Sequence, residues 1–470
     1  MGSAIASKPV IMKGRSTLVL KKFGLFIAIV LMMSAVLSAC GSGSGSGSNS
    51  GSNNSGSSAV SSGSSTNTGD TGTSEGDISG TIEFFSWWTS GGEGEALEAL
   101  IEGFKKHYPN VEVINAAVAG GGGVNAKAVL ANRMMANDPP SMFQVHGGAE
   151  LFEWVATGKM ETIDQLYEAN GWYNVYPAKV LEMVGKNGEM YGVPMNIHRL
   201  NVYYYNKAIF EQHNIQPPTT FDEFFAAADK LKAAGIIPIA LGDKSIWTVN
   251  VIFDSILLAE LGPEEYGKLW TGELPLDHEG VVRAAEKLKK LLSYVNEDHS
   301  SLEWQDATQM VIDGKAAMNI MGDWAVGFFI SKGWSPNVEF GWATMPDTGD
   351  YYLVNNDSFG LPKGIDNPEV VLKLLEYMGS VEGQSVFNAI KGSIPARTDV
   401  DVGNFNEYLQ WSMNDFKKAD QNNTLALTMS RGVAVPSGFL TKVEQALTVF
   451  VTQQNVDQLI QELKQAGSEL

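Results

Sequence analysis

Residues 81–118 read TIEFFSWWTS GGEGEALEAL IEGFKKHYPN VEVINAAV, and their pattern predicts a strand, a helix and a second strand. The first strand covers 81–87 and the second covers 111–118. Between them, apolar residues recur at the spacing of one helix face, namely at Leu97, Leu100, Ile101, Phe104 and Tyr108. This alternation of strand and helix predicts an α/β fold with a mainly parallel sheet.

The same alternation continues along the chain. The expected elements are a helix at 125–137, a strand at 142–145, a helix at 221–234 and strands at 236–241 and 316–321. Asp138-Pro139-Pro140 ends the first of these helices, and Thr220 and Glu223 form a capping-box pair before the second. Two such α/β layers, with no low-complexity break between them, predict two packed lobes.

Cys40 is the only cysteine in the chain, and it follows Leu37-Ser38-Ala39 at the end of an apolar run that starts at Phe23. Five basic residues precede that run. A basic start, an apolar middle and small residues at the end predict a secretory signal at 1–39. A cysteine in this position resembles a bacterial lipobox, in which the thiol is lipidated and becomes the new N-terminus. The alternative is a plain transmembrane anchor with an incidental cysteine, for which the apolar run is short.

Residues 41 to about 76 are almost entirely Ser, Gly, Asn and Thr. Such a composition cannot bury a core, so we expect 40–78 to be a disordered, lipid-anchored tether on the outer face of the cell membrane. The remaining chain of about 390 residues is long enough for two globular units. With no second cysteine, its stability must come from a large core rather than from disulfides.

The charge of the chain argues against anionic partners. The 53 acidic and 33 basic residues give a formal net charge of −20. The expected signal holds five basic and no acidic residues, so the remainder carries −25. A surface this negative repels nucleic acid and anionic lipid. The negative charge suits a receptor for neutral or cationic ligands. A role in solubility alone is an equally good explanation of it.

The motifs of several enzyme classes are missing. His278-Glu279 lacks the second histidine of a zinc-protease helix, no two histidines have metal-ligand spacing, and no Gly-x-Ser-x-Gly elbow occurs. The glycines at 120–123 suit a phosphate cradle but lack the Lys-Ser/Thr end of a P-loop, which favours a tight strand-to-helix turn. We therefore expect no enzymatic activity, no cofactor and no metal.

Aromatic and polar residues gather where the predicted strands end. Trp87 and Trp88 follow the first strand, and ligands of open α/β sheets bind beyond the carboxyl ends of strands. Tryptophan faces stack on the apolar faces of sugar rings. Because adjacent strand residues point to opposite sides, one of the two indoles alternatively belongs to the core. Glu93 either accepts hydrogen bonds from ligand hydroxyls or closes a capping box with Ser90.

Gln144 and His146 lie at the end of the third predicted strand, on one side of it. An amide and an imidazole together can donate to and accept from a hydroxyl group. A lone histidine in such a place is more often structural, but the combination with Gln144 and the Trp87 loop makes this pair a candidate site.

Several motifs carry a resemblance to a known family. They are Ser86-Trp87-Trp88, Gln144-Val145-His146, 194–199, 204–207, 314–318, Met321-Gly322-Asp323-Trp324 and 356–360. Together they resemble the solute-binding proteins of bacterial carbohydrate ABC transporters, and most of all the glucose/mannose-binding branch of the maltose-binding-protein-like family. The resemblance covers residues from about 80 to 460, and the motifs occur in the family's order.

The resemblance implies a periplasmic-binding-protein-like architecture, with two α/β lobes joined by hinge strands and a ligand cleft between them. The expected boundaries are 79–197 plus 323–362 for lobe 1 and 198–322 plus 363–470 for lobe 2. The resemblance implies that the chain crosses between the lobes three times, at 196–205, 318–322 and 359–363. We expect the lobes to close on the sugar by a hinge motion and the chain to act as a monomer.

The resemblance also implies the sites of carbohydrate contact. On the first lobe these are Trp87, Trp88, Glu93, Gln144 and His146. Trp304 and Trp324 match aromatic positions that stack on the sugar. Asp357 matches a carboxylate that accepts hydrogen bonds from hydroxyl groups, and Lys391 matches a hydrogen-bond donor from the other lobe. Packing within a helix remains the alternative for Trp304, and a helix C-terminal charge remains the alternative for Lys391.

One position departs from the family pattern. Related chains often place a histidine just before the glycine of Arg431-Gly432-Val433, where this chain has Arg431. Arginine is larger, always charged and only a donor. The substitution puts a glucose or galactose preference in doubt and is compatible with another epimer or an acidic sugar. The segment 247–251 departs as well, with apolar residues where polar ones are common.

The sequence therefore predicts a lipid-anchored receptor that binds a monosaccharide and delivers it to the permease subunits of an ABC importer. Nucleic acid is not an expected partner, and the only membrane contact is the lipid on Cys40. Two alternatives remain open. One is a glycoside hydrolase that uses carboxylates such as Glu93 and Asp357, and the other is a surface sugar sensor without transport.

Overall fold

The structure is a computed structural model that describes residues 78–470. The expectations for the signal, for Cys40 and for nearly all of the tether lie outside these residues. Within 78–470, no helix has the length and apolar character needed to cross a bilayer.

The first of two main sheets is built largely from the opening stretch. Its strands are β1 (Gly80–Phe85), β2 (Val111–Asn115), β3 (Met142–His146), β4 (Met160–Glu161), β7 (Val193–Pro194) and β14 (Asp357–Pro362). The order is β2-β1-β3-β14-β4, and β7 also pairs with β14. β1 runs parallel to β2 and β3, but β14 is antiparallel to its three neighbours. The prediction of a mainly parallel sheet is therefore wrong for β14, which enters directly from another sheet without a helical crossover.

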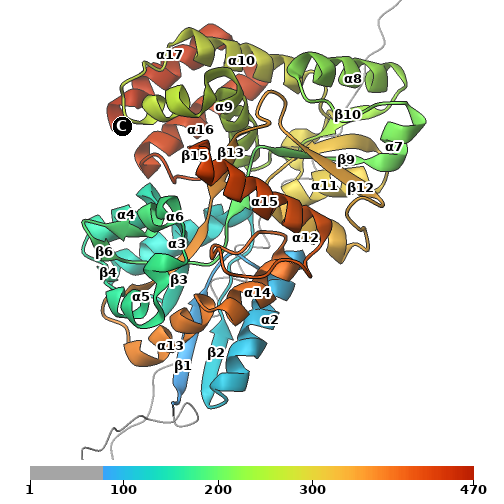
Figure 1. The fold of residues 1–470 in the computed structure, drawn as a ribbon. Coiled ribbons are helices and arrows are strands. Elements are labelled where there is room, and N and C mark those ends of the chain that lie inside the picture. Colours follow the sequence, from blue (N-terminus) through green and yellow to red (C-terminus); the bar gives the residue numbers. More distant parts are fainter. Residues whose placement is uncertain (1–77) are drawn as a thin grey trace, which may run out of the picture. The chain divides into compact units, whose positions relative to one another are not determined.

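Helices from both halves of the chain surround this sheet. They are α2 (Gly91–His107), α3 (Val124–Met135), α4 (Ala149–Ala156), α5 (Asp164–Asn170), α6 (Ala178–Val184), α13 (Pro368–Met378) and α14 (Val381–Lys391), with a hairpin of β5 (Gly185–Lys186) and β6 (Glu189–Met190). α14 lies along α2, and α13 packs on β1 and β14 (Figure 1). We call this assembly the first lobe. The expected boundary at 363 is thereby corrected, because α13 and α14 pack here and not on the second sheet.

The second lobe is centred on a four-stranded sheet in the order β10-β11-β9-β12. Its strands are β9 (Val202–Asn206), β10 (Ile237–Ala240), β11 (Ala316–Ile320) and β12 (Phe340–Thr344), and its helices are α7 (Lys207–Gln212), α8 (Phe221–Ala233), α9 (Trp247–Trp270), α10 (Glu279–Leu292), α11 (Trp304–Ile312), α16 (Ser437–Gln453) and α17 (Val456–Ala466). β12 pairs with β9, so residues 340–344 belong here and not to the first lobe as expected.

A third, three-stranded sheet and one helix connect the two lobes. The sheet has the order β15-β13-β8 and consists of β8 (His198–Arg199), β13 (Tyr352–Asn355) and β15 (Leu425–Leu427), with α15 (Glu407–Gln421) packed on β13 and β15. β8 follows β7 of the first lobe and precedes β9 of the second, while β13 leads directly into β14. α12 (Trp324–Ser331) contacts α2 and α14 on one side and α11 on the other.

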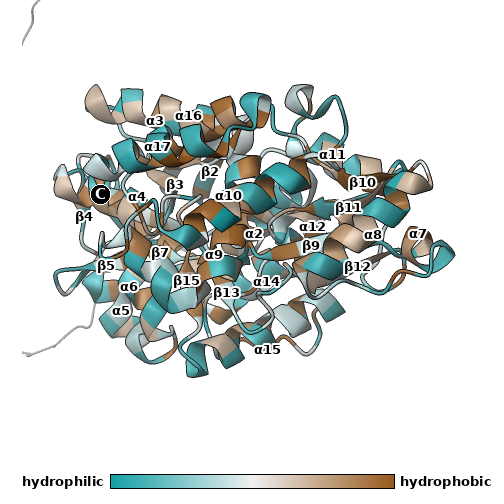
Figure 2. Cartoon of the chain, turned by 90° about the horizontal axis from the view of Figure 1, so that it is seen from above, coloured by the Kyte–Doolittle hydropathy of each residue, from teal (hydrophilic) through white to brown (hydrophobic). Residues whose placement is uncertain are grey.

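Local sequence signals explain several boundaries. The capping box that Thr220 and Glu223 predict is present at the start of α8. α9 is broken at Gly262, whose φ of +70° favours glycine, directly before Pro263. α10 is amphipathic, because its buried residues recur every three or four positions, as at Val281, Ala284 and Leu288. Hydrophilic and hydrophobic turns are both visible on α10 in Figure 2.

Phe359, in the middle of β14, joins strands that are far apart in the sequence. It is fully buried, and its ring centroid lies 4.9 Å from that of Phe84 and 5.4 Å from that of Trp88. The substitution Phe359→Ala leaves a cavity in this cluster and should lower the free energy of unfolding by about 3–5 kcal/mol. Guanidinium denaturation measures the change. As a control, Val338→Ala, at a side chain that is 64% exposed, should stay within about 0.5 kcal/mol of the wild type. Equal stability of Phe359→Ala and wild type would contradict this packing.

Candidate ligand-binding site

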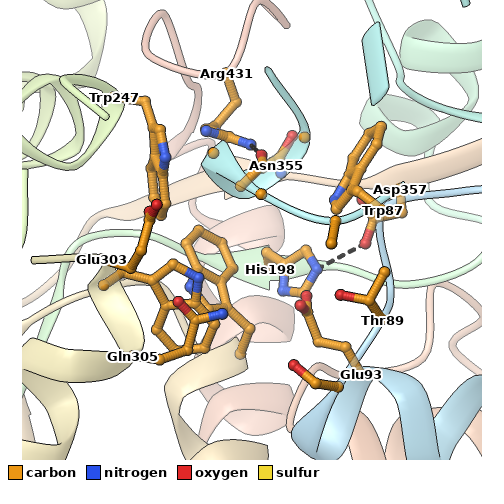
Figure 3. A pocket seen from close by; sticks show the side chains of 18 of the residues that line it. Trp87, Thr89, Glu93, His198, Trp247, Glu303, Gln305, Asn355, Asp357 and Arg431 are labelled. Carbon is orange, nitrogen blue, oxygen red and sulfur yellow. Dashed lines mark hydrogen bonds and ion pairs between the residues drawn. The ribbon is translucent and has the colours of Figure 1, made fainter. Parts of the chain in front are cut away.

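A cavity of about 220 Å³ lies between the lobes, where β3 ends and β14 begins (Figure 3). Eight predicted carbohydrate-binding residues line it, namely Trp87, Glu93, His146, Trp304, Trp324, Asp357, Lys391 and Arg431. The wall also includes residues that the sequence did not single out as ligand contacts, among them Thr89, His198, Trp247, Glu303, Gln305 and Asn355. The structure thus brings together side chains from the first lobe, the second lobe and the connecting segments.

The two adjacent indoles that follow β1 have different environments. Trp87 lines the cavity, with its ring centroid 5.2 Å from that of His146. Trp88 is fully buried in the core, where it packs against Phe359 and Phe387. Trp88 is therefore corrected from a wall residue to a core residue. β1 ends at Phe85, before the expected end of the strand at Trp87, and in the bend that follows only Trp87 reaches the cavity while Trp88 enters the core.

Gln144 does not line the cavity either, but it fixes two groups that do. Its Nε2 donates to Asp357 Oδ1 at 2.8 Å, and its Oε1 accepts from the backbone N–H of Trp87 at 3.1 Å. The side chain is almost fully buried. Gln144 is therefore a positioning residue for the aromatic loop and for the carboxylate, rather than a ligand contact.

The Asp357 carboxylate is held in the cavity wall by several hydrogen bonds. Besides the bond from Gln144, its Oδ2 accepts from His198 Nε2 and from Asn196 Nδ2, each at 2.9 Å. Burial disfavours the charged carboxylate, but the hydrogen bond and charge of His198, together with the charge of Lys391, outweigh burial and hold the pKa of Asp357 well below its usual range. The cavity wall therefore holds an oxygen acceptor that is ionised at neutral pH.

His198 is held between two buried carboxylates. Its Nδ1 bonds to Asp323 and its Nε2 to Asp357. Burial opposes the imidazolium, but the charge of Asp323 and the hydrogen bonds to Asp323 and Asp357 together outweigh burial and raise the pKa of His198. Asp323 Oδ2 also accepts from the backbone N–H of Arg199 at 3.0 Å. His198 belonged to a sequence motif of the family resemblance, but only the spatial arrangement reveals that it faces the cavity.

His146 has the opposite electrostatic behaviour. Burial and the charge of Lys127 lower the pKa of His146 to about 4, so the ring is neutral at neutral pH. Glu150 accepts from Nδ1 at 2.8 Å and from Lys127 Nζ at 2.7 Å. Burial disfavours the charged Glu150, yet Lys127 and His146 lower the pKa of Glu150 to about 2. A proton on Nδ1 makes Nε2, which lies 4.0 Å from Asp357 Oδ1, the unprotonated nitrogen of the ring.

Glu93, on α2, and Lys391, on α14, form an ion pair within the first lobe, so the expectation that Lys391 comes from the other lobe is wrong. Lys391 Nζ donates to Glu93 Oε1 at 2.8 Å, and the lysine side chain is 1% exposed. Ser90 makes no side-chain capping bond at the start of α2, so the capping alternative for Glu93 is not realised. Both residues line the cavity, with the donor and the acceptor side by side. Each keeps capacity for a further hydrogen bond.

Three indoles, contributed by the second lobe and by α12, line the cavity. The Trp247 and Trp324 ring centroids are 5.8 Å apart, and Trp324 lies edge-on to His198 at 5.3 Å. Trp304, the first residue of α11, packs against Phe328 and also borders the cavity, so helix packing and a place in the wall coexist. Flat apolar faces thus stand opposite the charged groups of the first lobe.

The glycine loop and Arg431 close one side of the cavity. Residues 120–123 form the tight turn expected before α3, and a Cβ on Gly122 would lie 2.7 Å from the indole of Trp247. Arg431 Nη2 donates to the carbonyl of Gly122 at 3.0 Å, and its guanidinium lies 4.7 Å from the centroid of Trp247. Burial lowers the pKa of Arg431 from its ordinary value. The glycines therefore allow the two lobes to approach closely at this point.

Comparisons with known proteins agree with this architecture. A profile of the family described as bacterial extracellular solute-binding protein matches residues 88–385. An uncharacterised ABC transporter extracellular-binding protein of Pyrococcus horikoshii is 38% identical, over 81% of this chain and 86% of that protein. A probable sugar-binding periplasmic protein of Brucella suis is 35% identical, over 81% and 89% of the two chains.

The fold is also found among solved structures. The bacterial solute receptor AcbH, described as having an exclusive preference for β-D-galactopyranose, superimposes with a TM-score of 0.72 at 20% identity, over 83% of this chain and 97% of that chain. At this identity the likeness concerns the fold alone, and it confirms the expected two-lobed α/β architecture.

The neutral, buried His146 should make the protein sensitive to acid. The unfolded chain takes up a proton near pH 6.5, but the folded chain does so only near pH 4, so stability is lost as the pH falls through this window. The expected loss is about 3 kcal/mol. Urea denaturation at several pH values measures it. His146→Gln, which cannot be protonated, should flatten the dependence, and equal slopes for the two proteins would contradict the assignment.

Proposed function

Because the chain belongs to the family of bacterial extracellular solute-binding proteins, we propose that it is the sugar-binding component of an ABC importer and that it binds a monosaccharide between its lobes. The observation that carries the proposal is the cavity of indole faces beside the ionised Asp357. The family consists of binding proteins, in agreement with the expectation that the chain is not an enzyme.

The chemistry of the wall supports a pyranose as the ligand. Indole faces of Trp87, Trp247 and Trp324 exclude water from the apolar faces of a sugar ring. Asp357 and Glu93 accept from hydroxyl groups, and hydrogen bonds to charged groups are stronger than those between neutral groups. The volume of about 220 Å³ is below the roughly 300–1,000 Å³ of sites for drug-sized molecules, which favours a single ring.

The electrostatics favour binding over glycoside hydrolysis. A glycosidase needs a carboxylic acid that stays protonated until it donates to the leaving group. Asp357 is instead held ionised by His198, and Glu93 is paired with Lys391. A surface sensor without transport is the other alternative. Uptake of labelled sugar that depends on both this chain and an ABC permease separates transport from sensing.

A panel of monosaccharides tests the proposed function. The purified mature chain is titrated with glucose, mannose, galactose and xylose, and its thermal unfolding is followed. A ligand at about 100 times its dissociation constant should stabilise the fold by about 2.7 kcal/mol. Saturable one-to-one binding of at least one sugar is expected. No stabilisation and no heat of binding with any of the four would contradict the proposal.

Asp357→Asn should weaken the binding of the preferred sugar about 10- to 100-fold, because a charged acceptor contributes roughly 1.5–3 kcal/mol per hydrogen bond. Calorimetric titration measures the dissociation constant, and a thermal melt without sugar confirms folding. The control Asp366→Asn changes an exposed carboxylate and should leave the affinity unchanged. An unaltered affinity in Asp357→Asn would place the sugar elsewhere.

The anchoring of the receptor is the second part of the proposal and is supported by the sequence around Cys40. We propose that the lipid on Cys40 holds the chain on the outer face of the cell membrane, where it acts as a monomer beside the permease. Cys40→Ser should move the protein from the membrane fraction to the soluble extracytoplasmic or culture-supernatant fraction. Fractionation with labelled palmitate measures both the location and the loss of label. Retention of label in Cys40→Ser would contradict lipidation at this residue.

A further inference from the structure

A second cavity, of about 380 Å³, lies directly behind the first. The two cavities share three wall residues, namely Gly122, Trp247 and Arg431. The second cavity extends between α3 and α4 of the first lobe and α9 and α16 of the second, so both cavities belong to one cleft between the lobes. We call them the front chamber and the rear chamber.

The Arg431 side chain forms much of the partition between the chambers. It is 7% exposed, it donates to the carbonyl of Gly122 in the first lobe, and it lies on the indole of Trp247 in the second. Its Nε is buried and has no hydrogen-bond partner. No carboxylate forms an ion pair with it among residues 78–470. The side chain is therefore a buried charge whose observed contacts all serve to fill the gap between the lobes.

The rear chamber has the same kinds of groups as the front chamber. Trp154 and Trp247 supply aromatic surface, and Leu440 adds apolar surface. Glu150, which is paired with Lys127, and Glu444 supply carboxyl groups. Burial raises the pKa of Glu444. Aromatic faces beside hydroxyl acceptors and donors suit a second pyranose better than a purely apolar group.

We propose that Arg431 determines the length of the ligand: it divides one cleft into two chambers, restricts the wild-type protein to a single ring, and on removal admits a second, glycosidically linked pyranose to the rear chamber. This inference rests on the proposed function, since the front chamber must hold the first ring. The specificity arises from a steric partition rather than from a direct contact with one hydroxyl group.

The test compares monosaccharides with disaccharides. The wild type, Arg431→Ala and Arg431→Ser are titrated with glucose, mannose, galactose and xylose, and with maltose, cellobiose, lactose, melibiose and xylobiose. We expect the wild type to bind its best monosaccharide at least tenfold more tightly than any of these disaccharides. In the variants, the ratio of disaccharide affinity to monosaccharide affinity should rise at least tenfold. Tighter binding of a disaccharide by the wild type, or an unchanged ratio in a variant that melts cooperatively, overturns the proposal.

A second substitution locates the gained affinity. Ala131, on α3, borders the rear chamber and not the front chamber. In the double variant Arg431→Ala with Ala131→Phe, the new phenyl ring refills the rear chamber and should abolish the gain in disaccharide affinity. Persistence of the gain overturns the assignment of the rear chamber to the second ring. If the wild type binds none of the monosaccharides, the proposed function itself fails; if it binds one and the ratio does not move, only this inference fails.

Discussion

The imidazole of His198 connects three segments that lie where the two lobes meet. His198 lies in β8, Asp323 directly precedes α12, and Asp357 begins β14. Hydrogen bonds join the ring to both carboxylates, and all three side chains are almost fully buried. A positive charge between two negative charges offsets much of the desolvation that each would otherwise suffer. The same arrangement keeps Asp357 ionised at the cavity wall, so one interaction links the junction of the lobes to the proposed acceptor for the ligand.

Most charges around the cavity are paired although the chain as a whole is strongly acidic. Lys391 pairs with Glu93 and Lys127 pairs with Glu150, whereas His198 lies between two carboxylates, Asp323 and Asp357, which leaves one negative charge in excess. Balanced pairs can present strong donors and acceptors without a large net field, which suits a neutral polyhydroxylated ligand. Arg431 is the exception, because it has no ion-pair partner within residues 78–470. The charges of nearby carboxylates, Glu150 and Glu444 foremost, oppose the cost of burying this guanidinium.

The α/β class and most elements of the first lobe could be predicted because strand and helix periodicities are local properties of the sequence. The position of β14 could not be predicted, since the strand pairs with β3 more than 200 residues earlier.

The candidate site could be predicted only in part, because contacts distant in the sequence also decide where its side chains lie. Alternation indicates that one of Trp87 and Trp88 is buried, but only packing against Phe359 and Phe387 decides which. Glu93 had a local capping interpretation, and its actual partner, Lys391, is 298 residues away. Trp247 lies in an apolar helix start, and only the approach of the glycine loop makes it part of a wall.

The central claim is that an ionised Asp357 and the surrounding indoles bind one pyranose between the lobes. A crystal structure of the protein with the sugar that binds most tightly tests this claim most directly. A sugar hydroxyl is expected within hydrogen-bond distance of the Asp357 carboxylate, with the indole of Trp87 or Trp324 against the sugar ring. A sugar bound outside this cavity, with Asp357 still contacting only Gln144, Asn196 and His198, would contradict it.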